Sequence, residues 1–230
     1  MHFLWLEIDT NVCSATLHLL LEGSRMKWIL DLCSGLGGAS EAFCHSPLWR
    51  VIRIENNEKL AHVPHTRILD VTRWNEWLPD IIEEYGPPHL ILAAPPCRDF
   101  STAYGAPRMI AKREGWAFEP DMSIFNACID VIEHCHNLGT HWWVLENVIG
   151  AIPYFSPIIG DPRQIIGPFI LWGVFPRLPL NHAEFKGHKA AADVWSSDPL
   201  RANKKAKWPI EVSQELLDAI NYQQTLSYWC

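Results

Sequence analysis

The sequence predicts an α/β protein with a Rossmann-like, mostly parallel sheet and helices on both faces. Short apolar runs alternate with stretches of helical periodicity, which is the pattern of successive βαβ units. Polar residues typical of binding sites follow the ends of these runs, and open α/β sheets bind ligands at the carboxyl ends of their strands. The 230 residues, 48% of them hydrophobic, are enough for one sizeable core.

Four strands are predicted in the first half of the chain. They are the apolar runs at residues 28–32, 51–54, 68–71 and 89–94. The first run leads into the glycine-rich turn 34–38, after which we expect a helix over 39–44. The fourth run stops at two prolines, which lack the N–H group that a central strand needs.

The second half is predicted to contain one long helix, further strands and a closing helix. Apolar residues recur at 124, 125, 128, 131, 132, 135 and 138, so a helix with one buried stripe is expected over 121–138. A fifth strand is expected at 141–145, and one or two more within 165–174, where Gly167-Pro168 interrupts the apolar run. Residues 176–207 are polar without a clear period, and a helix over 211–222 closes the chain.

The charge balance argues against an extensive nucleic-acid footprint. The formal net charge is -7, whereas a protein that binds duplex DNA through a broad face is normally basic. Basic residues gather in two clusters, at Arg98, Arg108, Lys112 and Arg113 and at Arg201, Lys204, Lys205 and Lys207. Charge alone favours solvated loops for both clusters, and a local contact with nucleic acid stays open.

Seven cysteines at irregular spacing, without a CxxC pair, do not form a disulfide-scaffold pattern, so we expect a reducing cytosol. Cys128 and Cys135 fall on the apolar stripe of the long helix, which favours buried thiols over metal ligands, and no metal is expected. No apolar run reaches the ~20 residues that span a bilayer, and the first ten residues are a poor signal peptide. A cytoplasmic protein without a membrane partner is therefore expected.

The segment DLCSGLGG, at residues 31–38, ends the first strand with a turn suited to a ligand. Its glycines let the backbone approach a ligand closely, although they do not match the dinucleotide fingerprint GxGxxG. Glu55 lies 24 residues after Asp31 and suits a pair of ribose hydroxyls, and Asp70 is suited to accept a hydrogen bond from an exocyclic amine. Together these residues indicate an adenosine site. The turn taken alone is equally consistent with an ordinary strand-to-helix connection.

Two further strand ends have groups suited to nucleophilic and acid catalysis. Pro95 and Pro96 hold the backbone so that the Cys97 thiol is presented at the sheet edge. The neighbouring Arg98 favours its thiolate form. Glu146 ends the fifth strand, where a semi-buried carboxylic acid can protonate the ring nitrogen of a pyrimidine. A chance loop thiol and a strand-capping or arginine-paired glutamate are the alternatives for these residues taken singly.

The blocks DLCSGLGG, APPCRDFS and LENV, in this order, resemble the signature blocks of the DNA (cytosine-5) methyltransferases. The resemblance covers about residues 27–175. It implies a class I methyltransferase sheet, S-adenosylmethionine as cofactor and cytosine-containing DNA, duplex or single-stranded, as partner. It also implies that Cys97 attacks C6 of cytosine while Glu146 contacts N3. The methyl group then passes to C5, and loss of the C5 proton releases the enzyme.

The resemblance assigns roles to residues in and near these blocks. The implied catalytic residues are Cys97, Glu146, Arg163 and Ser101. The implied cofactor-binding residues are Asp31, Cys33, Gly35, Gly37, Gly38, Glu55, Asn56, Asp70, Val71 and Pro95. The implied substrate-binding residues are Pro96, Arg98, Phe100, Asn147 and Val148.

The chain departs from this family in its last third. The family's glutamine-arginine-arginine block is reduced to Arg163 and Gln164, and KAKWPIEVSQELLDAI replaces its C-terminal glycine-asparagine-serine. Only about thirty residues separate Val174 from the final helix, which leaves no room for a large target-recognition domain. The layout is most similar to small methyltransferases of bacteriophages. We therefore expect a monomer in the cytoplasm of a bacterial host, with a short target sequence.

Three segments are expected. Residues 1–25 are an N-terminal extension of unassigned role, 26–175 are the S-adenosylmethionine-dependent catalytic domain, and 176–230 are a reduced recognition segment and C-terminal helix that complete the same domain. Two alternatives stay open. The same chemistry on RNA or a free cytidine nucleotide suits the acidic charge, and a catalytically silent module would keep only the cofactor-binding fold.

Overall fold

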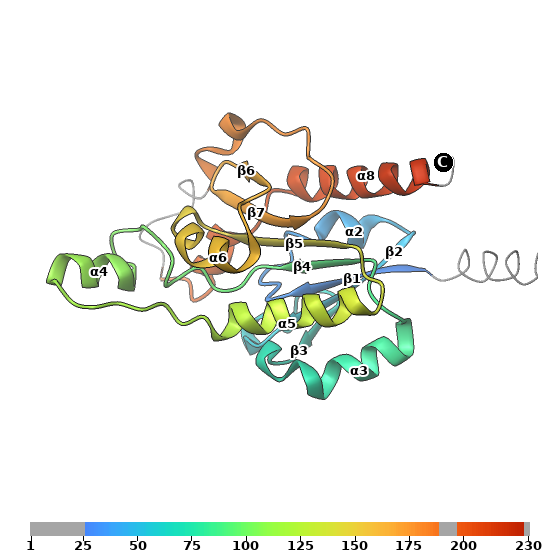
Figure 1. The fold of residues 1–230 in the computed structure, drawn as a ribbon, viewed down its shortest axis with the longest axis horizontal. Coiled ribbons are helices and arrows are strands. Elements are labelled where there is room, and N and C mark those ends of the chain that lie inside the picture. The colour runs from blue at the N-terminus through green and yellow to red at the C-terminus, as the bar shows by residue number, and fades with distance from the viewer. Residues whose placement is uncertain (1–25, 189–196, 228–230) are drawn as a thin grey trace, which may run out of the picture.

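The computed structural model describes residues 26–188 and 197–227, so the N-terminal extension 1–25 lies outside the described residues. Seven strands form one sheet in the order β3-β2-β1-β4-β5-β7-β6 (Figure 1). The strands are β1 (Lys27–Leu32), β2 (Trp49–Glu55), β3 (Thr66–Ile68), β4 (Leu90–Ala93), β5 (Trp142–Asn147), β6 (Gln164–Ile166) and β7 (Phe169–Val174). β7 is antiparallel to both of its neighbours, and every other pairing is parallel.

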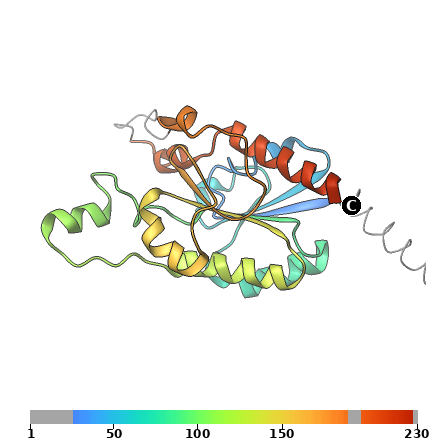
Figure 2. The same cartoon turned by 45° about the horizontal axis from the view of Figure 1, so that its top comes forward.

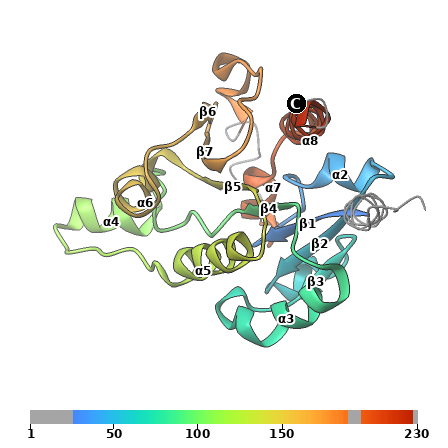
Figure 3. The ribbon, with the colours of Figure 1, turned by 45° about the vertical axis from the view of Figure 1, so that its right-hand side comes forward.

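Helices cover both faces of the sheet. They are α2 (Glu41–His45), α3 (Trp74–Tyr85), α4 (Pro107–Glu114), α5 (Ser123–Asn137), α6 (Ile152–Ile159), α7 (Arg201–Ala206) and α8 (Ile210–Ser227). α2 and α8 pack on one face, and α3, α5 and α6 on the other (Figure 3). Along β1, Leu30 and Leu32 face the α5 side and Ile29 faces the α8 side, so each face has its own core. The predicted mostly parallel α/β sheet with helices on both faces is thus confirmed.

The strand order reverses at the centre of the sheet, between β1 and β4. β1 pairs with β2 on one side, which places Leu32 beside Ile54, and with β4 on the other, which places Leu32 beside Ala93. The connections after these two strands therefore lead away in opposite directions. A doubly wound sheet binds its ligand in the crevice that such a reversal opens.

The sequence pattern does not predict α3, α4, α6 or α7. α3 contains Pro79, and α6 has Pro153 in its first turn and Pro157 inside, and internal prolines lower helix propensity. Proline is tolerated in a first turn, where its missing N–H would have no helical partner. Packing of Trp77 and Phe155 in the core outweighs the low helix propensity of the remaining segments.

The structure corrects one local prediction and confirms another. The strand predicted at 68–71 lies at Thr66–Ile68, and a 3-10 turn begins at Val71. The apolar run 165–174 forms two antiparallel strands, with Gly167 at a φ of +55° in the turn between them. The predicted burial of Cys128 and Cys135 is confirmed. None of the helices in the described ranges is long and apolar enough to cross a bilayer.

Candidate active site

A cavity of about 620 Å³ lies at the carboxyl ends of the central strands. Four of the five strand-end groups that the sequence indicates line it. They are Asp31 from β1, Glu55 from β2, Cys97 after β4 and Glu146 from β5. The parallel pairing of these strands brings the four groups to one edge of the sheet. The volume is that of a small-molecule or cofactor site.

The glycine-rich turn after β1 forms one wall of the cavity. Gly35 and Gly37 have φ values of +56° and +72°, which glycine adopts without strain. Gly35 lines the cavity, whereas Gly37 does not. A Cβ at Gly37 would lie 2.3 Å from Cζ of Arg53. Glycine at position 37 therefore makes room for a buried guanidinium instead of contacting the cavity as predicted.

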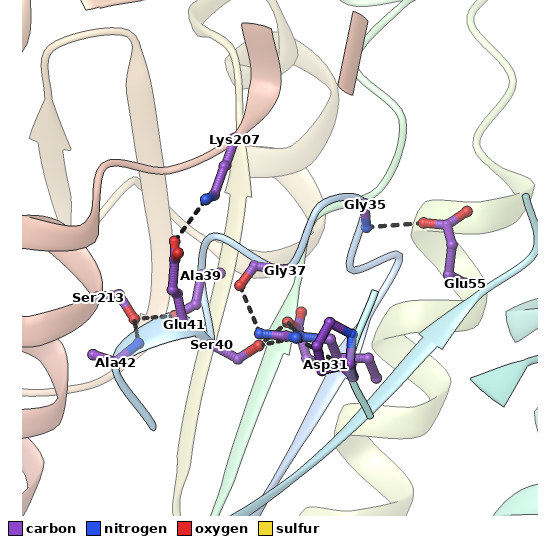
Figure 4. Close-up of polar contacts among 12 residues, drawn as sticks. Asp31, Gly35, Gly37, Ala39, Ser40, Glu41, Ala42, Glu55, Lys207 and Ser213 are labelled. Atoms are coloured by element: carbon purple, nitrogen blue, oxygen red, sulfur yellow. Dashed lines mark hydrogen bonds and ion pairs between the residues drawn. The ribbon is translucent and has the colours of Figure 1, made fainter. Parts of the chain in front are cut away.

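Arg53 supports the turn from the core side. Its guanidinium donates hydrogen bonds to the Ser40 hydroxyl (2.9 Å) and to the carbonyl oxygens of Gly37 (2.9 Å) and Pro64 (2.8 Å). Asp31 accepts a hydrogen bond of 2.6 Å from the Ser40 hydroxyl and lies 3.8 Å from Nε of Arg53 (Figure 4). Burial raises the pKa of Asp31 to about 6, and the charge of Arg53 opposes this effect only in part.

The Arg53→Met protein is expected to be less stable than wild type by about 3–5 kcal/mol. The substitution leaves Asp31 buried without its ionic partner and removes the donors of two backbone carbonyls. Urea denaturation measures the free energy of unfolding. Arg67→Met changes an exposed arginine on β3 and is the matched control, with an expected effect below about 0.5 kcal/mol. Equal stabilities of the two variants would contradict a supporting role for Arg53.

Two buried oxygen atoms on the cavity wall have no hydrogen-bond partner among the described residues. They are Oδ1 of Asp31 and Oγ of Ser34. Buried polar atoms in proteins are nearly always hydrogen-bonded, so this pair indicates a ligand that brings donors. An ionised Asp31 in particular suits a cationic donor such as an ammonium group.

The carboxylate of Glu55 lies against the glycine turn (Figure 4). Oε2 accepts a hydrogen bond of 2.9 Å from the amide of Gly35. Oε1 accepts hydrogen bonds of 3.0 Å from the amides of Asn56 and Asn57. A carboxylate has about four acceptor sites, so Oε2 keeps capacity for a ligand hydroxyl. Glu55 therefore braces the turn and still faces the cavity.

Asp70 is exposed and does not line the cavity. Its carboxylate caps the following 3-10 turn by accepting hydrogen bonds from the hydroxyl and the amide of Thr72, both at 2.8 Å. These bonds lower the pKa of Asp70. Its neighbours Leu69 and Val71 line the cavity instead. The cavity is therefore lined by apolar side chains at the position where the sequence predicts a contact between Asp70 and the cofactor.

Adjacent strands hold Cys97 and Glu146 at the cavity. Pro95 is buried, Pro96 is exposed and Cys97 is partly exposed, so the two prolines lead the chain out of the core to the thiol. Glu146 is only 7% exposed. Nδ2 of Asn147 donates a hydrogen bond of 2.9 Å to the carbonyl oxygen of Pro95, which ties β5 to the loop with the thiol. Asn147 is thus a positioning residue, outside the cavity lining itself.

A second thiol, Cys33, lines the same cavity. Its φ of 54° is unusual for a residue other than glycine. A hydrogen bond with the thiol of Cys128, together with burial, raises the pKa of Cys33 well above its usual value. A thiol that stays protonated is a poor nucleophile. Of the two thiols at the cavity, Cys97 is therefore the better candidate.

Three more of the predicted site residues lie outside the cavity lining. Phe100 is buried against Phe155, with ring centroids 4.9 Å apart, and Val148 packs against the same core. Arg163 donates a hydrogen bond to the carbonyl oxygen of Phe175 and covers its ring, so it stabilises the sheet edge at β6 and β7. The predicted residues that line the cavity are Asp31, Cys33, Gly35, Gly38, Glu55, Asn56, Val71, Pro95, Pro96, Cys97, Arg98, Ser101 and Glu146.

α7 and the residues that follow it form a wall of the cavity that the sequence pattern does not predict. Its lining residues are Arg201, Ala202, Asn203, Ala206, Lys207 and Trp208. A Cβ at Gly38 would lie 2.7 Å from the backbone nitrogen of Trp208, so this segment passes directly over the glycine turn. Lys207 forms an ion pair of 2.8 Å with Glu41 (Figure 4).

Ser213 fixes α8 to the residues that follow the turn (Figure 4). Its hydroxyl donates a hydrogen bond of 2.8 Å to the carbonyl oxygen of Ala39 and accepts one of 3.1 Å from the amide of Ala42.

Arg53 and residues 201–207 are parts of the site that the sequence pattern does not predict, but each has a signal in the sequence. Arg53 is a charge inside the buried strand WRVIRIE, which requires partners, and residues 201–207 are the second basic cluster.

No protein-family model matches this chain, and comparison with curated proteins finds no match. The functional assignment therefore depends on the residues and geometry of the cavity.

Proposed function

We propose that this protein is an S-adenosylmethionine-dependent methyltransferase that methylates C5 of cytosine in DNA. The observation on which the proposal rests is the convergence of Cys97 and Glu146 on the cavity that the glycine turn and Glu55 also line. A thiol and an acid placed together suit addition to a pyrimidine ring, and the turn suits a nucleoside cofactor. The strand order, with β7 antiparallel between β5 and β6, is compatible with a class I methyltransferase sheet.

The cavity has groups suited to each part of S-adenosylmethionine. Oε2 of Glu55 would accept a hydrogen bond from a ribose hydroxyl, and Leu69 and Val71 would contact the adenine. Oδ1 of Asp31 would accept a hydrogen bond from the ammonium group, and the backbone at Gly35 allows close approach. When bound, this cofactor supplies an electrophilic methyl group.

Cys97 and Glu146 would act on the cytosine ring. The thiolate adds to C6 and forms an S–C6 bond, while Glu146 protonates N3 or donates a hydrogen bond to it and so makes the ring electrophilic. The electron pair that addition would place on C5 could then accept the methyl group that the cofactor supplies, with S-adenosylhomocysteine as the leaving group. Loss of the C5 proton to solvent would break the S–C6 bond and restore the thiolate, and return of the N3 proton would restore the acid form of Glu146. Asn147, through its hydrogen bond to the carbonyl oxygen of Pro95, would hold the acid and the thiol at a fixed separation.

Radiolabelled S-adenosylmethionine with four substrates side by side tests the proposal. They are duplex DNA, single-stranded DNA, RNA and deoxycytidine nucleotides. Label transfer to DNA is the expected result. Transfer only to RNA or to nucleotides would replace the substrate and keep the chemistry. Cofactor binding without transfer to any of the four would instead favour a silent cofactor-binding module.

S-adenosylhomocysteine is expected to bind with a micromolar Kd, equivalent to about 7–9 kcal/mol. Glu55→Ala is expected to weaken binding by about 10–100-fold, because it removes a charged acceptor for the ribose and the brace on Gly35. Isothermal calorimetry measures both affinities. Glu58→Ala, an exposed change in the following 3-10 turn, is the matched control and is expected to leave the affinity unchanged. No heat of binding with folded wild-type protein would overturn the methyltransferase proposal.

Affinity for S-adenosylhomocysteine is expected to fall as the pH is lowered through about 6. The ammonium group of the ligand binds the ionised form of Asp31, whose pKa is raised to about 6 by burial. Without ligand, the raised pKa of Asp31 gives stability the opposite dependence on pH. The folded state binds this proton more tightly than the unfolded chain does, so the contribution of Asp31 to stability decreases as the pH rises from about 4 to 6. Calorimetry across this range measures the affinity. Asp31→Asn should bind more weakly and lose the pH dependence; an unchanged profile would exclude Asp31 as the ligand acceptor.

A further inference from the structure

Between β4 and α5 the chain forms an arm, residues 101–122, that contains α4. The arm projects beyond the sheet and its covering helices (Figures 1 and 2). Its root lines the cavity immediately after Cys97, through Ser101, Ala103 and the residues 105–107. A cytosine that reached Cys97, as the proposed function requires, would enter beside the root of this arm.

The arm presents two aromatic side chains to solvent. Tyr104 is 79% exposed and Trp116 is 66% exposed. Exposed aromatic rings are suited to stack against planar ligands, and two of them lie here on one arm whose root lines the cavity. The guanidinium of Arg113 lies 4.0 Å from the ring centroid of Tyr104 and donates a hydrogen bond of 2.6 Å to its carbonyl oxygen. Arg113 thus ties the backbone at Tyr104 to α4 and packs against one face of the tyrosine ring.

The same arm contains three of the four residues of the first basic cluster, all of them on α4. α4 has Arg108, Lys112 and Arg113 against one acid, Glu114, whereas the other two acids of the arm, Glu119 and Asp121, lie beyond the helix, so the positive charge is confined to α4. Arg108 fixes the arm to the body by donating a hydrogen bond of 3.1 Å to the carbonyl oxygen of Gly150. Lys112 and Arg113 are exposed. The arm thus combines anchored geometry, exposed aromatic rings and cations gathered on α4.

We infer that this arm is a stacking platform for an unpaired DNA strand, whose bases contact Trp116 and Tyr104 while Lys112 and Arg113 neutralise its phosphates. The inference rests on the proposed function and specifies its substrate as single-stranded DNA. Aromatic rings interleaved with a few cations are the means by which proteins bind single strands without reading their sequence. Duplex DNA presents stacked, paired bases and a denser phosphate charge, which an acidic protein with few local cations binds poorly.

Fluorescence anisotropy tests the inference with a labelled single-stranded oligodeoxynucleotide containing one cytosine and with the duplex of the same sequence. The wild-type protein is expected to bind the single strand more tightly. Trp116→Ala is expected to weaken this binding by about 5–150-fold, the value of one stacked base, and Trp116→Phe to restore most of it. Tyr222→Ala removes a tyrosine that is 65% exposed on α8 and is the matched control, with no expected effect.

The dependence of binding on salt concentration distinguishes the contribution of charge from that of stacking. Lys112→Ala is expected to weaken binding of the single strand. It should also reduce the slope of the logarithm of the binding constant against the logarithm of salt concentration by about one, which corresponds to one phosphate contact. Trp116→Ala should leave this slope unchanged. Because Trp116 and Lys112 are both exposed, neither change should alter the urea midpoint, which serves as the folding control.

Three results would overturn the inference. They are duplex binding as tight as single-strand binding, equal affinities of the Trp116→Ala and Tyr222→Ala proteins, and tighter binding of single-stranded RNA than of DNA of the same sequence. These affinities are measured without turnover. Failure of the methyltransferase proposal appears separately, as absent binding of S-adenosylhomocysteine or absent methyl transfer by a protein that still binds the strand.

Discussion

The Cys97→Ser protein is expected to bind S-adenosylhomocysteine with wild-type affinity and to transfer no methyl group to cytosine above background. A serine hydroxyl has nearly the shape of a thiol, but near neutral pH it is a far weaker nucleophile than a thiolate. The groups proposed to hold the cofactor, Glu55 and Asp31, lie on other strands. The loss should therefore fall on the chemical step. Radiolabel transfer measures the rate, and calorimetry measures the cofactor affinity.

DNA that contains 5-fluorocytosine gives an independent measurement on the same residue. Fluorine at C5 cannot leave as a cation, so elimination stalls and the S–C6 bond persists. Mass spectrometry is expected to locate this adduct on the peptide with Cys97. Cys33→Ser is the matched control, because it makes the same change at the other thiol of the cavity, and it should keep most of the activity. An adduct on Cys33, or a wild-type rate for Cys97→Ser, would show that the proposed mechanism is wrong.

The Glu146→Gln protein is expected to lose a factor of about 10²–10⁴ in the rate of methyl transfer, the usual contribution of a general acid. The amide has nearly the same shape and can still donate a hydrogen bond to N3, but it cannot protonate the ring. Glu146 is only 7% exposed, so a charged replacement would be costly there. Glutamine is neutral and has nearly the same shape, so this change should cost little stability. Single-turnover kinetics with bound DNA separates this effect from substrate binding.

Two controls accompany the change at Glu146. Glu83→Gln alters an exposed glutamate on α3 and should leave the rate unchanged. Calorimetry with S-adenosylhomocysteine should give wild-type affinity for Glu146→Gln, since the proposed cofactor contacts lie on β1 and β2 and in the segment that follows them. A rate within a factor of three of wild type would contradict the role of Glu146 as the acid at N3.

Strand ends were the most predictable part of the site. A buried parallel strand is a continuous apolar run, so the polar residue that follows it is visible in the sequence. This is why Asp31, Glu55, Cys97 and Glu146 were all identified, and all four line one cavity. Asp70 shows the limit of the same reasoning. It follows an apolar run too, but its carboxylate turns to the amide and hydroxyl of Thr72 and away from the cavity.

By itself, therefore, the sequence determined the α/β class, the strand ends that face the site and the two reactive groups of the proposed chemistry, because these depend on local periodicity and on where each run stops. Only the tertiary structure decided which distant segments meet. Ser213 bonds to Ala42, 171 residues earlier, and Trp208 passes over Gly38. Such contacts follow from how helices pack on the finished sheet, which no local pattern encodes. Arg53 beneath Gly37 has the same origin, since its partners are assembled only when the turn folds over β2.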